Sequence, residues 1–242
     1  MQLAGRPVEP DPSAATWVVA ALASAMSGAV ASLVPGGFAA LARVLHPAIR
    51  YEGDDDVEVR WAAVARHNGR TAHRLMQWPA ITGSWDFVAD LDQPGLWNDA
   101  PAEGHLPVAV AERLTAVLSR HTAAPTDCWF GLSAEAAPEL AAPDGPARYL
   151  LVRGPLALAA VNFAPEPAEQ GPSLWWPADR SWVVVTDPHL TSTYVAGSAA
   201  AIAEVLAADG IDAWPATPAD PVTPGSDPLN PLPEDVPPGA DH

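Results

Sequence analysis

Apolar residues recur every three or four positions over residues 107–121, the spacing that lets an α-helix bury one side. Its stripe consists of Leu106, Val110, Leu114, Val117 and Leu118. A shorter helix is predicted after Ser198, which can cap it, and Gly210 ends it. Further short helices are predicted over residues 59–67 and 72–78.

Runs rich in aromatic and β-branched residues predict strands in the second half of the chain. These runs cover residues 127–132, 148–153, 182–186 and 193–195, with a further edge strand at 211–214 as an option. Residues 38–49 suit either a helix or a strand, and residues 52–56 suit a charged loop. We therefore expect an α+β fold in which a helix-rich N-terminal half packs on a small, mostly antiparallel sheet from the C-terminal half.

Composition divides the chain into three parts. Residues 1–13 hold three prolines and no periodic pattern, which predicts a flexible N-terminal arm. Residues 215–242 contain nine prolines and five acids, which predicts a disordered acidic tail. Residues 14–214 are then expected to form a single globular domain.

The uncharged stretch over residues 14–34 is long enough to cross a bilayer. It is rich in Ala, Ser and Gly, and acidic, proline-rich residues precede it where an export signal would be basic. We expect a buried helix here, and membrane association is the weaker alternative. Arg43 and Arg50, which follow the stretch, would suit a cytoplasmic flank of a span.

Charge and motif content exclude several classes of function. The chain has 12 basic residues, all Arg, against 29 acidic ones, a net charge of −17 that argues against nucleic-acid binding. A single cysteine, Cys128, excludes an intrachain disulfide and suits the cytoplasm. The chain has no phosphate-binding glycine loop, so we expect no cofactor. Its seven histidines do not show the spacing of metal ligands, so we expect no metal. The arginines between Arg43 and Arg74 are expected to pair with the acids of residues 52–58.

The most distinctive string is PSLWWPADRSWVVVTD, residues 172–187. Trp175, Trp176 and Trp182 are costly to leave in water, and Asp179-Arg180 lie between them. The string predicts either a corner where a loop tucks under the sheet or an aromatic groove that grips a partner.

Together with residues 34–48 and 193–207, this string resembles a group of actinobacterial proteins to which no activity is attached. The shared segments are Arg-Val-x-His-Pro early in the chain and Trp-Pro-x-Asp-Arg-x-Trp late in it. The resemblance covers about residues 14–214 and implies that a common framework includes Arg43, His46, Trp176, Asp179 and Arg180.

Two hypotheses of function follow. The first is a non-enzymatic, cytoplasmic protein-binding or regulatory domain, of the immunity or adaptor kind, whose partner is another protein. Its contact surface would be the Trp-rich corner formed by Trp175, Trp176, Asp179, Arg180 and Arg43.

The second is a small hydrolase or transferase that acts on an anionic substrate. His46 would be its general base, Asp179 would orient that base, and Arg43 or Arg180 would hold the substrate. Neither the oligomeric state nor the partner follows from the sequence.

Overall fold

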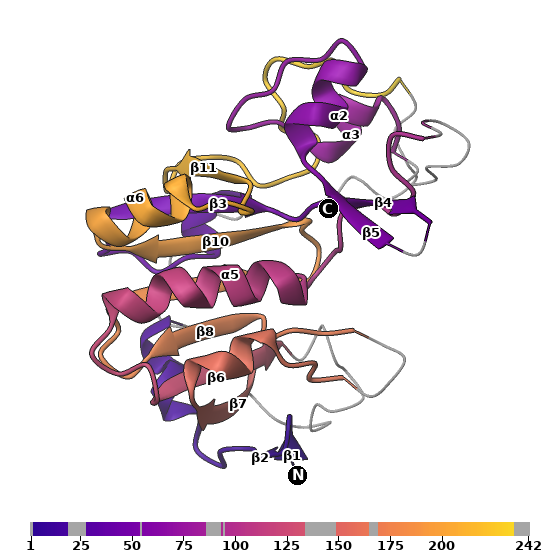
Figure 1. Cartoon of the computed structure of the whole chain (residues 1–242). Coiled ribbons are helices and arrows are strands. Elements are labelled where there is room, and N and C mark those ends of the chain that lie inside the picture. Colours follow the sequence, from indigo (N-terminus) through magenta and orange to yellow (C-terminus); the bar gives the residue numbers. More distant parts are fainter. Residues whose placement is uncertain are drawn as a thin grey trace. The chain divides into compact units, whose positions relative to one another are not determined.

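The computed structural model describes residues 2–18, 28–53, 55–85, 93, 95–133, 149–164 and 169–234. The chain separates into two units (Figure 1). Unit 1 contains Met1–His46 and Glu103–Ala219, and unit 2 contains Pro47–Ala102 and Asp220–His242.

An antiparallel sheet of seven strands is the centre of unit 1, with strand order β11-β3-β10-β9-β8-β6-β7 in the described residues. The strands are β3 (Ala40–Leu45), β6 (Cys128–Ser133), β7 (Tyr149–Gly154), β8 (Leu174–Pro177), β9 (Trp182–Thr186), β10 (Ser192–Gly197) and β11 (Ala213–Ala216). Side chains alternate between the two faces of a strand, so Ala42 and Val44 enter the main core while Arg43 and Leu45 lie on the opposite face.

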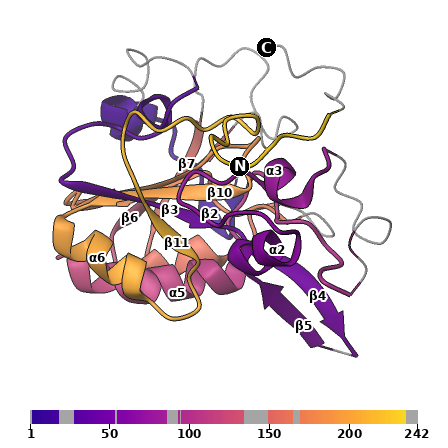
Figure 2. The same ribbon diagram turned by 90° about the horizontal axis from the view of Figure 1, so that it is seen from above.

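Helices cover one face of this sheet, as Figure 2 shows for α5 (Val108–Leu118) and α6 (Ala199–Ala207). The short 3₁₀ helix η4 (Leu156–Ala160) packs beside α5. A second 3₁₀ helix, η3 (Ser119–His121), directly follows α5 in the chain. The predicted helix stripe is confirmed, because Val110, Leu114 and Leu118 are buried in the core. The predicted cap is also confirmed, since the Ser198 side chain accepts a hydrogen bond from the backbone N–H of Ala201.

N-terminal residues lie on both the edge and the second face of the sheet. They form β1 (Gln2–Leu3), β2 (Arg6–Pro7), η1 (Pro12–Ala15) and η2 (Val30–Ser32). Leu3 is buried in the main core, and the N–H of Glu9 donates to the carbonyl of Leu151 in β7. Residues 2–13 are therefore attached to the sheet, in contrast to the flexible arm expected from the prolines.

The middle of the predicted buried helix of residues 14–34, residues 19–27, lies outside the described residues, and the described part after it holds the short 3₁₀ helix η2. Within the part of the chain that the structure describes, no helix has the length and apolar character needed to cross a membrane.

The described residues of unit 2 form a hairpin, β4 (Ala48–Glu52) with β5 (Asp55–Val59), and two short helices, α2 (Trp61–His67) and α3 (Trp78–Thr82). Three buried tryptophans form its centre. The rings of Trp61 and Trp78 lie 5.3 Å apart, and those of Trp78 and Trp97 lie 5.2 Å apart. The helix predicted over 59–67 is confirmed, whereas the piece predicted over 72–78 begins only at its last residue.

Acidic residues after Ala219 attach the chain to unit 2, where the sequence predicted the start of a disordered tail. Asp220 forms an ion pair with Arg74, and Asp227 accepts a hydrogen bond from His73 at 2.9 Å. The amide of Asn230 donates to the carbonyl of Thr71 and accepts from its N–H. Residues 220–234 thus satisfy polar groups of residues 71–77, and Arg74 pairs with an acid far along the chain rather than with residues 52–58.

The predicted arrangement of a helix-rich first half on a sheet from the second half is wrong, although the α+β class holds. Strand β3 comes from the first half of the chain and lies in the sheet between β11 and β10. The expected charged loop contributes to the β4–β5 hairpin. The apolar pattern of residues 38–49 suits both a helix and a strand, and pairing with β10 and β11 makes residues 40–45 a strand.

Candidate functional site

The two outer tryptophans of the Trp-rich corner are core residues of unit 1. Trp175 and Trp182 are at most 1% exposed, and their rings meet edge to face at 5.4 Å. The indole of Trp182 donates a hydrogen bond to the carbonyl of Leu118, which anchors the end of α5. The predicted loop corner is instead a strand, β8, inside the sheet.

Trp176 points to the other face of the sheet and is also 1% exposed. It stacks on Trp129 at 6.4 Å and meets the edge of Trp17 at 5.9 Å. The guanidinium of Arg180 lies over Trp17 at 5.1 Å, and that of Arg153 lies over Trp129 at 5.2 Å. These cation–π contacts close both ends of a packed row, so Trp176 contributes to the fold and offers no surface to a partner.

Asp179 holds the turn between β8 and β9. Its carboxylate accepts hydrogen bonds from the hydroxyl of Thr122 and from the backbone N–H groups of Ala123 and Ser181. Burial alone would raise the pKa of Asp179, but these hydrogen bonds outweigh it, so the pKa lies below its usual value. The carboxylate is charged and engaged in local structure.

Arg43 and His46 lie at the opposite end of the strands. The Nε of Arg43 donates to the hydroxyl of Ser192 at 3.1 Å. His46, fully buried, bonds through Nε2 to the hydroxyl of Thr193 at 2.9 Å, and that hydroxyl lies 2.7 Å from the hydroxyl of Thr186. Both residues thus form buried polar contacts between strands.

Strand register separates His46 from Asp179. Gly197 pairs with Ala40 on one side and with Trp182 on the other, so the turn that contains Asp179 lies beside the start of β3. His46 follows the end of β3, and a six-residue strand spans about 20 Å. The structure does not bring the proposed base and its orienting carboxylate together.

Two other chemical candidates can be assessed in the described residues. Burial, with smaller contributions from the charges of Asp127 and Asp179, raises the pKa of the Cys128 thiol to about 12, so this thiol is protonated at neutral pH. Within the described ranges, no group of three His, Cys, Asp or Glu residues is arranged to hold a metal ion.

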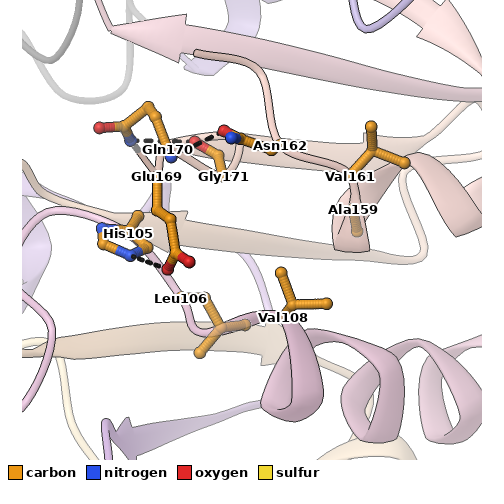
Figure 3. A pocket seen from close by; sticks show the side chains of 9 residues that line it. All are labelled: His105, Leu106, Val108, Ala159, Val161, Asn162, Glu169, Gln170 and Gly171. Atoms are coloured by element: carbon orange, nitrogen blue, oxygen red, sulfur yellow. Dashed lines mark hydrogen bonds and ion pairs between the residues drawn. The ribbon is translucent and has the colours of Figure 1, made fainter. Parts of the chain in front are cut away.

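A small cavity of about 120 Å³ opens beside the first turn of α5 (Figure 3). Its apolar side chains come from Leu106 and Val108 at the helix start and from Ala159 and Val161 around the end of η4. His105 and the segment 169–171 supply its polar side, with Asn162 at the upper rim. Val108 and Val161, which both line this hollow, are 48% and 38% exposed.

Hydrogen bonds between three chain segments fix the walls of this pocket. The side-chain oxygen of Asn162 accepts from the N–H of Gln170, and the amide of Gln170 donates to the carbonyl of Gly104. The N–H of Gly104 donates in turn to the carbonyl of Leu190. Gly104 has φ of +78°, and a Cβ there would lie 2.7 Å from the carbonyl oxygen of Pro188, so glycine is required at this approach.

The titratable groups of the pocket are His105 and Glu169. Figure 3 shows the Glu169 carboxylate directed at the imidazole, with 3.9 Å between Oε2 and Nε2. The His105 side chain is 18% exposed and that of Glu169 is 79% exposed. A ligand can therefore reach the carboxylate from solvent while it contacts the apolar wall.

Sequence reasoning missed this pocket because its residues lie on three distant segments. One signal was present: Val108 is an apolar residue off the buried stripe of its helix. A single exposed apolar residue is ordinary on a protein surface, so this signal alone could not have located the pocket.

No family profile, curated protein or solved structure matches this chain.

Proposed function

We propose that this chain is a non-catalytic protein-binding domain that receives one aliphatic side chain of a partner in the pocket beside α5. The observation that carries the proposal is a cavity of about 120 Å³ flanked by two exposed valines. Pockets for drug-sized ligands and cofactors measure about 300–1,000 Å³, so this one suits a single side chain instead.

The chemistry of the wall supports an apolar anchor. Two of the five large apolar side chains that are exposed in the described residues, Val108 and Val161, line this one pocket. Interfaces draw most of their affinity from a few anchors that fill such pockets, surrounded by a polar rim. His105, Glu169 and Gln170 would be that rim.

The partner we propose is a basic protein of the cytoplasm. A net charge of −17 accelerates encounter with basic surfaces and repels acidic ones. The single cysteine, which is buried, supports a reducing compartment. This proposal keeps the binding class expected from the sequence and moves the contact surface from the Trp-rich corner to the pocket.

Selection from a random peptide display library tests the proposal. The full chain should enrich peptides that share one aliphatic residue, and these should lose binding to Val161→Asn. Leu229→Asn is the matched control, because Leu229 is also an exposed apolar residue, 63% accessible, but belongs to unit 2. Circular dichroism should show both variants folded. Enriched peptides that bind Val161→Asn as well as the wild type would refute the proposal.

A further inference from the structure

In its neutral form, His105 leaves two hydrogen-bond acceptors facing each other at the polar side of the pocket. Its Nδ1 lies 3.2 Å from the carbonyl oxygen of Glu103, and a carbonyl only accepts, so the hydrogen of the neutral ring is on Nδ1. The bare Nε2 then faces the Glu169 carboxylate across 3.9 Å. His105 Nε2 and Glu169 Oε2 are then both hydrogen-bond acceptors, and neither supplies a hydrogen to the other.

A donor from a ligand can satisfy both atoms at once. A nitrogen at the usual hydrogen-bond distance of about 2.9 Å from each would see them at an angle of roughly 85°. An ammonium group carries three N–H donors in a tetrahedral array and can serve two acceptors at such an angle, whereas a hydroxyl has one hydrogen to donate. Its positive charge also matches the carboxylate, which strengthens the hydrogen bond.

The apolar wall lies next to this gap, because Leu106 and Val108, one and three positions after His105 in the chain, line the same pocket. Figure 3 shows both side chains below the imidazole and the carboxylate. A ligand that fills the pocket with an aliphatic group thus brings its neighbouring substituents to Glu169.

We propose that the segment recognised by this pocket is basic: it carries a lysine close to its aliphatic anchor, and the lysine ammonium bridges Glu169 Oε2 and His105 Nε2. This inference rests on the proposed function and adds the chemistry of the partner. The exposed carboxylate and the charge of −17 both favour a cationic segment over a neutral or acidic one.

Synthetic peptides test the lysine directly. The probes are fluorescent pentapeptides with one leucine and one lysine among alanines, with the lysine placed one to three positions before or after the leucine. Each is compared at pH 7.5 with the same peptide carrying Nζ-acetyl-lysine, which keeps the length and removes the charge. For the best spacing we expect the lysine peptide to bind about fivefold more tightly, the upper range for an exposed ion pair.

Two variants separate the lysine contact from the anchor contact. Glu169→Gln should bring the affinity ratio of the two peptides close to one, while Glu112→Gln, an exposed glutamate of α5 outside the pocket, should leave the ratio unchanged. Val161→Asn should weaken both peptides together.

The outcomes distinguish the two proposals. Equal binding of both peptides to the wild type, with loss on Val161→Asn, would overturn the lysine bridge and leave the protein-binding pocket in place. Binding that Val161→Asn does not weaken, or no binding by any peptide of the set, would overturn both.

Discussion

Replacement of Asp227 by asparagine should weaken the attachment of residues 220–234 to the rest of unit 2. The Asp227 side chain is 0% exposed, and its carboxylate accepts five hydrogen bonds. The donors are His73 Nε2, the backbone N–H groups of Gln77, Leu229 and Asn230, and the side-chain amide of Asn230. Asparagine has almost the same volume as aspartate, so the substitution changes these hydrogen bonds without opening a cavity.

The loss of stability depends on which carboxylate oxygen of Asp227 becomes the NH₂ group of asparagine. Oδ1 accepts from three of the donors, so the new carbonyl would take that place and the new NH₂ group would replace Oδ2. That NH₂ would face the N–H of Gln77 and the amide of Asn230, which are both donors. Two buried hydrogen bonds are lost and their donors left unsatisfied, which costs about 3 kcal/mol.

Hydrogen exchange with mass spectrometry measures this cost. A loss of about 3 kcal/mol raises the open population of the segment by roughly 150-fold, and exchange over residues 220–234 should accelerate accordingly. Asp11→Asn is the control, because Asp11 accepts similar local bonds at an exposed site in unit 1 and should change exchange there by less than about threefold. Exchange over residues 220–234 that is the same in Asp227→Asn and in the wild type would refute the reasoning.

The same carboxylate gives the segment a defined response to acid. Burial alone would raise the pKa of Asp227, but hydrogen bonds from Asn230, Leu229 and Gln77 outweigh burial and hold the pKa below its usual value. A lowered pKa in the folded state stabilises the segment above the unfolded pKa of about 3.9, and this contribution disappears as the pH falls through the folded pKa. Protection factors over 220–234 should stay constant from neutral pH to about 5 and fall only below about 4.

Two further predictions concern unit 1. Trp176→Ala should lower the free energy of unfolding by about 3–5 kcal/mol in urea titrations, because it empties the middle of the row between Trp129 and Trp17; a loss below about 1 kcal/mol would contradict that packing. The Cys128 thiol, whose pKa burial raises to about 12, should resist Ellman's reagent at pH 8 in the native protein and react fully in guanidinium; rapid native labelling would contradict its burial.

Local patterns predicted individual helices and most strands better than the pairing of the strands, since the predicted runs at 127–132, 148–153 and 182–186 match β6, β7 and β9. Helix α5 shows 3.6-residue periodicity over eleven residues, and the Ser198 cap of α6 is a local contact, so both are visible in the sequence. Strand β3 is a short run of apolar residues whose identity depends on partners 149 residues away, as the bond from Arg43 to Ser192 illustrates. Such pairings have no local signal.

The candidate site was harder to predict than the fold for the same reason. The sequence favoured Trp176, Asp179 and His46 because aromatic and titratable residues stand out in composition, and the structure uses all three in internal contacts. The pocket combines His105 with Glu169, two residues without a shared motif that meet only once the Gln170 amide joins its loop to Gly104.

Methyl NMR of the full chain titrated with N-acetyl-leucinamide tests the central claim most directly, with N-acetyl-glycinamide as the control. The account predicts saturable shifts of the methyl groups of Leu106, Val108 and Val161 with the leucine probe and no shifts with the glycine probe, because only leucine can fill a cavity of about 120 Å³. Shifts confined to other methyl groups, or equal responses to the two probes, would contradict the assignment of this pocket as a side-chain binding site.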